Sequence, residues 1–287
     1  MPILSIVVRA RNDIKYIQRT LTAISSQNFK DFEIICFDSG STDGTLEVIK
    51  SFKPSHLIEI KPEDYVPGKV LNHAVRLCKG KVVVFNNSDC IPKDSDWLSK
   101  LTEPLINDST GKISATFCDQ LARPDARPLV KKDHARAFGD GVISAYWHNF
   151  FSLASSAIPR QLLLDNPFDE TLQYSEDIEW SWRMKKKLYY IKYVSDAKVE
   201  HSHNYRLKEV WERFYNEGLA EGQIYGNDSS SIKGFALPCV AEMLRDWKYL
   251  FIHGYALGVP YGIVYRFMQR YAVWKGRTDY LKSKAKI

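Results

Sequence analysis

The first ninety residues alternate between short β-branched runs and segments with a helical apolar period, and this alternation constrains the fold most strongly. Residues 3–8 form an apolar, β-branched run, whereas Ile14, Ile17, Leu21 and Ile24 recur at helical spacing in residues 13–26. The same patterns predict further strands at residues 32–37, 57–60 and 81–85, and further helices at residues 45–52 and 70–78. Strands that alternate with helices indicate βαβ units and a mostly parallel sheet.

Polar residues follow three of these predicted strands. The segments that carry them are Arg9-Ala10-Arg11-Asn12 after the first strand, Asp38 to Asp43 after the second, and Asn86 to Asp89 after the fourth. Ligands bind beyond the carboxyl ends of parallel strands, so the three segments form a candidate site. Asp43, which precedes a glycine, has the alternative role of capping the next helix.

No glycine-rich phosphate cradle is present in the sequence. Neither GxGxxG nor GxxxxGK[ST] occurs. A bound nucleoside diphosphate would therefore need a metal ion, and Asp89 is the carboxylate placed to hold it.

Composition excludes several classes of protein. Hydrophobic residues make up 45% of the 287 residues and charged residues 26%, as in soluble globular proteins rather than disordered ones. The five cysteines are scattered without a CxxC pair, which favours reduced thiols in the cytosol over disulfides or a zinc site. The apolar run near the amino end is interrupted by Arg9 and Arg11, too early for a signal peptide.

The carboxyl end carries the net charge. Residues 265–287 contain seven basic residues and one acid, and the whole chain has a formal charge of +6. Residues 249–265, just before this tail, have no formal charge but include Pro260 and three glycines. This pattern fits an interfacial anchor on an anionic membrane, or alternatively a buried helical hairpin or a homodimer interface with a solvated tail. Nucleic-acid binding is not expected, because the charges lack an accompanying fold.

Four motifs in order resemble the inverting glycosyltransferases of family 2, which have the GT-A fold. The similar segments are residues 5–12, residues 38–45 (DSGSTDGT), Asn87-Ser-Asp89 at the position of the family's DxD motif, and Ser175-Glu-Asp177. The resemblance covers residues 5 to about 221. It implies an α/β GT-A domain over residues 1–222. Residues 223–287 lie outside the resemblance, and their composition predicts a helical, basic extension.

The resemblance also implies roles for individual residues. Donor nucleotide binding is expected from Arg9, Ala10, Arg11, Asn12, Asp38, Ser39, Gly68, Lys69, Asn87 and Ser88. The metal is expected at Asp89 and His201, with His203 as the other candidate, and Asp177 is the expected catalytic base. Glu176 and Trp180 are expected on the acceptor side.

One departure from the family pattern and one histidine pair bear on the metal site. Asn87 replaces the first Asp of the DxD motif, which keeps a hydrogen-bonding group for the ribose but removes one anionic ligand. His201 and His203 follow a predicted strand at i and i+2, and on a strand this spacing would place both on one face. The alternative for His203 is a capping or packing role.

The expected activity follows from the resemblance. A sugar would pass from a dTDP-, UDP- or GDP-linked donor to a glycan or lipid-linked glycan, with inversion and with Mn²⁺ or Mg²⁺ as cofactor. The rhamnosyltransferase-like members, which build bacterial surface polysaccharide, are the most similar. The expected location is the cytoplasm or the inner face of the cytoplasmic membrane. The alternatives are a catalytically impaired module that binds nucleotide sugar or glycan, and a hydrolase of nucleotide sugars.

Overall fold

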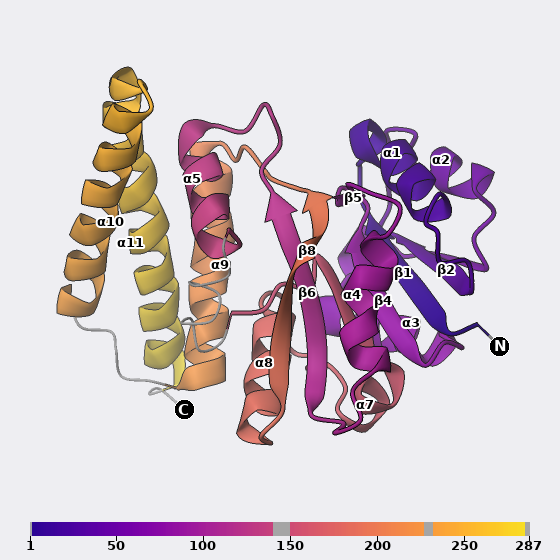
Figure 1. The fold of residues 1–287 in the computed structure, drawn as a ribbon. Helices are drawn as coiled ribbons and strands as arrows, with labels where there is room; N and C mark the ends of the chain where they lie inside the picture. The colour runs from indigo at the N-terminus through magenta and orange to yellow at the C-terminus, as the bar shows by residue number, and fades with distance from the viewer. Residues whose placement is uncertain (1, 140–149, 227–231, 285–287) are drawn as a thin grey trace. The chain divides into compact units, whose positions relative to one another are not determined.

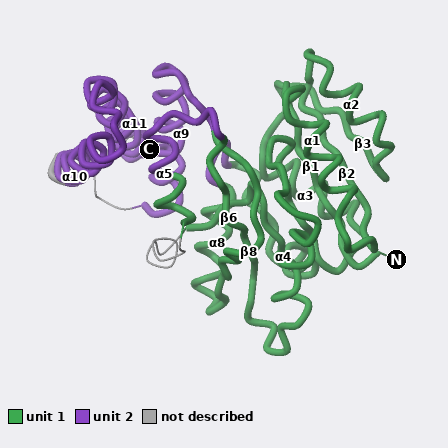
Figure 2. Tube along the Cα trace, turned by 45° about the horizontal axis from the view of Figure 1, so that its top comes forward, with its two compact units in different colours: residues 1–123, 134–171, 176–202 green, residues 124–133, 172–175, 203–287 purple. Residues whose placement is uncertain are grey.

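The computed structural model describes residues 2–139, 150–226 and 232–284. They form two compact units, coloured separately in Figure 2. The first unit comprises Met1–Arg123, His134–Thr171 and Glu176–Ser202; the second comprises Pro124–Asp133, Leu172–Ser175 and His203–Ile287. The sequence-based boundary between residues 222 and 223 stays a prediction.

The first unit is built on an eight-stranded sheet with the order β3-β2-β1-β4-β7-β6-β8-β5 (Figure 1). The strands are β1 Leu4–Ala10, β2 Phe32–Asp38, β3 His56–Glu59, β4 Val82–Asn87, β5 Ile91–Pro92, β6 Ile113–Leu121, β7 Ser155–Pro159 and β8 Tyr190–Glu200. The first four pair in parallel, as do β6 and β8, whereas β7 is antiparallel to β4 and β6. The predicted α/β fold and its first four strands are confirmed.

Helices cover both faces of this sheet (Figure 1). They are α1 Ile14–Ser25, α2 Thr45–Ser51, α3 Pro67–Leu77, α4 Trp97–Ile106, α7 Arg160–Asp165 and α8 Glu176–Lys186, with a short 3₁₀ helix η1 at Pro62–Asp64. Successive residues of β1 point to opposite faces, so Ile6 packs in the core that includes α1 and α4, and Val7 in the core that includes α3 and α8. All five cysteines are buried and unpaired, in agreement with the predicted absence of disulfides.

The second unit is helical. It contains α9 Leu207–Tyr225, α10 Ile232–Ile252, a 3₁₀ turn η2 at Ala256–Gly258 and α11 Val259–Lys284. Residues 128–133, the first part of α5 (Pro128–Ala137), also belong to it. Pro128 occupies the first position of that helix, where proline needs no amide hydrogen.

Glycines allow α9 and α11 to approach each other closely. A methyl group on Gly276 would lie 2.1 Å from the carbonyl oxygen of Tyr215, and one on Gly218 would lie 2.2 Å from that of Val273. These two positions therefore require glycine because the facing atoms are backbone and cannot rotate away. Among the described helices, none is both long and apolar enough to cross a membrane.

Replacing Gly276 by alanine should destabilise the helical unit. The added methyl must push α9 and α11 apart, and overpacking of this kind typically costs about 1–3 kcal/mol of unfolding free energy. Thermal unfolding followed by circular dichroism measures the loss. Gly258→Ala is the matched control, because its added methyl would meet Leu250 at an ordinary 3.6 Å. Equal unfolding temperatures for the two variants would contradict the close-packing explanation.

Candidate active site

The parallel pairing of β1 with two neighbours brings the polar strand ends together. Ala10 at the end of β1 lies opposite Asp38 of β2, and Arg9 lies opposite Asn87 of β4. The next backbone contacts continue this arrangement, because the Ser39 amide donates to Ala10 and the Ser88 amide donates to Arg9. The three polar segments that the sequence singled out thus meet at one edge of the sheet.

Asp38 is almost completely buried at this edge. Its Oδ1 accepts hydrogen bonds from the amides of Gly40 and Ser41, at 3.1 and 2.9 Å. Its Oδ2 is also buried, and no donor among the described residues reaches it. A buried carboxylate oxygen without a donor carries a desolvation penalty that a ligand N–H would relieve, and a nucleobase has such groups.

The loop after β1 is tied to the loop after β2. Asn12 has a left-handed backbone, with φ of 55°, which asparagine tolerates better than most residues. Its Oδ1 accepts from the Thr42 amide at 2.8 Å, and its own amide donates to Ser41 Oγ at 2.9 Å. Asn12 therefore shapes the predicted nucleotide loop through internal contacts, while Arg11 beside it is exposed.

Asp43 has the structural role that the sequence left open. Its Oδ1 accepts from the Thr45 amide at the start of α2, and its Oδ2 accepts from the Ile14 amide at the start of α1. One carboxylate thus supplies acceptors to the amino ends of two helices, where amides lack partners within the helix.

Arg9 connects the strand ends to α8. Its guanidinium donates to Asn87 Oδ1 at 3.2 Å and to Glu176 Oε1 at 3.4 Å. Glu176 is buried, and burial together with the neighbouring charge of Asp177 raises the pKa of its carboxyl group. The positive charge of Arg9 lowers this pKa in part, because it stabilises the ionised carboxylate. Glu176 is therefore the ion-pair partner of Arg9.

Asp177 lies in the first turn of α8. Its two carboxylate oxygens accept from the amides of Leu153 and Ile178, at 3.1 and 2.8 Å. Burial raises the pKa of Asp177 although these hydrogen bonds lower it. A carboxylate with a raised pKa is a stronger base than an exposed aspartate, which suits proton abstraction.

Asp89 and His201 form the candidate metal centre. His201 Nε2 lies 3.5 Å from Asp89 Oδ2, and with the Cys90 sulfur they form a buried cluster whose candidate ligand atoms lie within 4.8 Å of one another. Burial raises the pKa of the Cys90 thiol well above its ordinary value, so this sulfur stays protonated. Carboxylate is a donor type that suits Mn²⁺, and the cluster adds the imidazole of His201 as a nitrogen ligand.

Two further residues hold this centre, and the sequence reasoning missed both. Gln120 Oε1 lies 2.8 Å from His201 Nδ1, and since a carbonyl oxygen only accepts, it fixes the proton on Nδ1. The Arg123 guanidinium donates to Asp89 Oδ2 at 3.1 Å and lies 3.8 Å from the centre of the Tyr16 ring. Neither residue lies in a local motif, so no signal in the sequence marked them.

The histidine pair differs from its predicted geometry. Strand β8 ends at Glu200, so the expectation that His201 and His203 share one face of a strand was wrong. His201 belongs to the first unit with Asp89, whereas His203 belongs to the second unit and stacks on Tyr205 with ring centres 5.2 Å apart.

Several other predicted site residues have structural contacts. A methyl group on Gly68 would lie 2.2 Å from the Asp169 carbonyl oxygen, so this glycine allows close packing of α3. Lys69, one residue later, is exposed. Ser88 is buried and donates its hydroxyl to Asp13, a carboxylate that the sequence reasoning did not single out.

Trp180 lies in the core rather than at a surface that an acceptor could reach. It is fully buried, and its indole nitrogen donates to the Asn166 carbonyl at 2.8 Å. The ring packs near Phe168 and Phe151. Its expected acceptor contact is therefore not available to this side chain.

Comparisons with known proteins agree with this arrangement. The pattern described as Glycosyl transferase family 2 matches residues 5–152. The chain is 28% identical over 219 residues to an O-antigen chain rhamnosyltransferase of Salmonella typhimurium, and 27% identical over 213 residues to one of Salmonella anatum. Each match covers 69% of this chain, and it spans 66% and 65% of the two relatives, just under two thirds of their length.

Solved structures share the fold at low sequence identity. A mannosyltransferase of Pyrobaculum calidifontis, in complex with GDP-Man and Mn²⁺, has a TM-score of 0.69 at 19% identity, covering 99% of this chain and 88% of that one. Glucosyl-3-phosphoglycerate synthase of Mycobacterium tuberculosis, in complex with Mn²⁺ and UDP, has a TM-score of 0.57 at 21% identity, covering 80% and 82%. Both have the GT-A fold. Since the family pattern extends over half of its residues, the chain belongs to glycosyl transferase family 2.

Proposed function

We propose that this protein transfers a sugar from a nucleoside-diphosphate donor to an acceptor hydroxyl, with inversion at the anomeric carbon. The observation that carries the proposal is the edge formed by β1, β2 and β4. Asp38, whose buried Oδ2 meets no donor within the described part of the chain, lies across the strand ends from the pair of Asp89 and His201. A nucleoside diphosphate has groups for both ends of this edge: N–H donors on the base and oxygens on the phosphates.

Asp38 would receive the base. Its buried Oδ2 gains a hydrogen bond from a base N–H, and this replaces water lost on folding. Residues 9–12 and Ser39 form the surrounding loop, which Asn12 keeps in shape. Asn87, whose amide can both donate and accept, would contact the ribose while its Oδ1 faces Arg9.

Asp89 and His201 would hold a divalent cation, Mn²⁺ or Mg²⁺. The Asp89 carboxylate is the donor type that suits such an ion. The His201 imidazole, whose proton is fixed on Nδ1, presents Nε2 on the side of Asp89 as a nitrogen ligand. When bound, the cation supplies charge stabilisation to the departing diphosphate. Lys69, exposed in the first turn of α3, would contribute a further positive charge.

Asp177 would accept the proton of the attacking hydroxyl. Two backbone amides fix the orientation of its carboxylate, and its raised pKa favours proton uptake. Glu176, engaged by Arg9, would stand on the acceptor side as a positioning group. A general base of this kind contributes about 10²–10⁴-fold to the rate.

The similar O-antigen rhamnosyltransferases support a narrower proposal. The donor would be a dTDP-linked sugar and the acceptor a glycan or lipid-linked glycan of bacterial surface polysaccharide, made at the cytoplasmic side of the membrane. UDP- and GDP-linked sugars are tested as donors as well, because the shape of the pocket decides which sugar binds.

The test is calorimetric titration with dTDP-, UDP- and GDP-sugars, each with Mn²⁺ and with EDTA. We expect one nucleotide class to bind, with clearly weaker binding in EDTA, because Asp89 and His201 would meet the diphosphate through the cation. Transfer is then assayed with that donor and a glycan acceptor. The absence of binding by every donor would contradict the donor site.

The same experiment separates the alternatives. Donor binding without any turnover, with or without acceptor, would indicate a binding module, the alternative that Asn87 raised. Release of free sugar at the same rate with and without acceptor would indicate a hydrolase. Acceptor-dependent product with inverted configuration is the outcome that the proposal expects.

Asp177→Asn should abolish transfer while donor binding persists. The amide keeps the shape of the side chain but cannot take up a proton, so kcat should fall by about 10²–10⁴-fold. Donor affinity from calorimetry should stay within about twofold of the parent. Asp196→Asn, at an exposed position of β8, is the matched control and should be neutral. Near-normal transfer by Asp177→Asn would rule out this residue as the base.

Gln120→Leu should weaken metal binding through His201. Without the Oε1 acceptor, the imidazole loses the contact that fixes its tautomer, and loss of such a supporting contact typically lowers metal affinity about 10–100-fold. Mn²⁺ affinity, measured by electron paramagnetic resonance with the donor diphosphate present, reports the change directly. Gln161→Leu, at an exposed glutamine of α7, is the matched control. Unchanged Mn²⁺ affinity in Gln120→Leu would contradict the role of Gln120.

A further inference from the structure

Helix α10 has its polarity inverted relative to an ordinary surface helix. Its large apolar side chains are exposed: Leu237 is 70% exposed, Phe251 63%, and Val240 and Leu244 just over half. These four positions recur at helical spacing and form one stripe. An ordinary surface helix turns such a stripe toward the core, so this one is suited to an apolar or interfacial surrounding.

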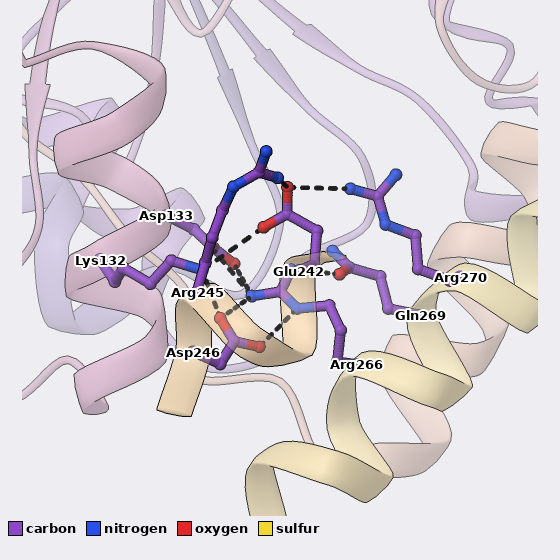
Figure 3. Close-up of polar contacts among 8 residues, drawn as sticks. All are labelled: Lys132, Asp133, Glu242, Arg245, Asp246, Arg266, Gln269 and Arg270. Carbon is purple, nitrogen blue, oxygen red and sulfur yellow. Dashed lines mark hydrogen bonds and ion pairs between the residues drawn. The ribbon is translucent and has the colours of Figure 1, made fainter. Parts of the chain in front are cut away.

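The opposite face of α10 buries its charges. Asp246 is completely buried and pairs with Lys132 of α5 and with Arg266 of α11, whose Nε lies 2.8 Å from Asp246 Oδ2 (Figure 3). Arg266 also reaches Asp133 at 3.0 Å. These contacts join three helices of the second unit through ionic groups, beside the apolar cluster that includes Leu129, Leu250 and Tyr265.

Glu242 extends this network one turn earlier on α10. It is buried and pairs with Lys132 at 3.5 Å, with Arg270 at 3.7 Å and with Arg245 (Figure 3). Inward-facing, mutually paired charges with apolar side chains outside are the arrangement that proteins adopt against lipid, since water does not compete for the outer face. The inner network fixes which face of the hairpin is presented outward.

The turn between α10 and α11 is the most exposed apolar part of the chain that the structure describes. Leu257 of η2 is 99% exposed and Ile252 68%. Tyr255, before η2, and Tyr261, after it, are also exposed. Tyrosines that flank an aliphatic tip are typical of side chains that lie at a membrane–water boundary.

The charges around this tip favour an anionic surface. Residues 247–278 contain no Asp or Glu. The two acids of α10 are buried in the ionic network, and Asp279 of α11 is paired with Lys275. Lys248 is exposed and lies on the apolar stripe, one turn from Leu244, where its aliphatic stem can lie along the stripe with the ammonium group in the head-group region.

We propose that the hairpin formed by α10, η2 and α11 docks on an anionic membrane surface, with Leu257 and Ile252 inserted at the boundary and Lys248 near the lipid head groups. Among the described helices none can cross a bilayer, so docking would be interfacial. A second copy of the chain is the competing occupant. It would bring together two surfaces that lack exposed acids and that each carry Lys248, and like charges oppose that contact.

This proposal goes beyond sugar transfer and does not depend on it. Docking would hold the enzyme at the surface where a lipid-linked acceptor resides, but the interaction itself needs neither donor nor metal. Vesicle binding and donor binding can therefore fail separately.

The test is cosedimentation of the full chain with phosphatidylglycerol–phosphatidylcholine vesicles, compared with phosphatidylcholine alone. We expect binding to the anionic vesicles that weakens as salt rises, because the cationic residues contribute through a screened attraction. Leu257→Asp should reduce the partition coefficient about tenfold, and Leu257→Ser should reduce it less, because serine removes the apolar contact without adding charge. Lys248→Glu should weaken binding to the anionic vesicles alone.

Leu188→Asp is the matched control, since this leucine is 81% exposed in the first unit and should not affect vesicle binding. Thermal unfolding and donor titration of Leu257→Asp should match the parent, because an exposed side chain supports no core. Failure of the parent to bind anionic vesicles, or equal binding by Leu257→Asp, would overturn the proposal. A dimer in light scattering that Leu257→Asp dissociates, without vesicle binding, would assign the surface to a second copy instead.

Discussion

The parallel hydrogen-bond ladder of β1 with β2 and β4 is the interaction on which the candidate site depends. β1 lies between these strands, and its alternate residues supply both cores, as Ile6 and Val7 show. A slip of one residue would turn each apolar side chain of β1 toward the wrong face. The same slip would separate Arg9 from Asn87 and Ala10 from Asp38. Burial of an apolar strand therefore sets the geometry of polar groups beyond its end.

This dependence explains which parts of the site were predictable. Strand ends can be located from local patterns, so the convergence of residues 9–12, Asp38 and Asn87 followed from the predicted topology. Gln120 and Arg123 contact His201 and Asp89 across sequence separations of 81 and 34 residues, and no local pattern encodes such contacts. Trp180, in contrast, was predicted as a site residue but lies in the core. The Ser-Glu-Asp motif begins its helix, but the helical face that carries Trp180 turns into the core.

The carboxyl-terminal helices show why hydropathy alone left alternatives open. Seventeen uncharged residues are compatible with a buried hairpin, a dimer interface or an interfacial anchor. The ionic partners of α10 and α11 decide which face is inside. Lys132 and Asp133 come from α5, far away in the sequence, so no local pattern encodes these contacts. Buried ion pairs often add little net stability, because desolvation offsets their attraction. Their clearer consequence here is orientation: with Asp246 and Arg266 paired inside, the apolar stripe has to lie outside.

Arg123, like Asn87 at the altered DxD position, lowers the negative charge at the candidate metal centre. Asn87 removes one negative charge from the edge of the sheet, and the Arg123 guanidinium neutralises much of the charge on Asp89. A divalent cation at Asp89 and His201 would therefore meet a protein site with little net negative charge, and it would require further anionic ligands. The diphosphate of a donor has such ligands. Because protein and diphosphate would each supply part of the coordination shell, we expect the cation and the donor to bind together more tightly than either binds alone.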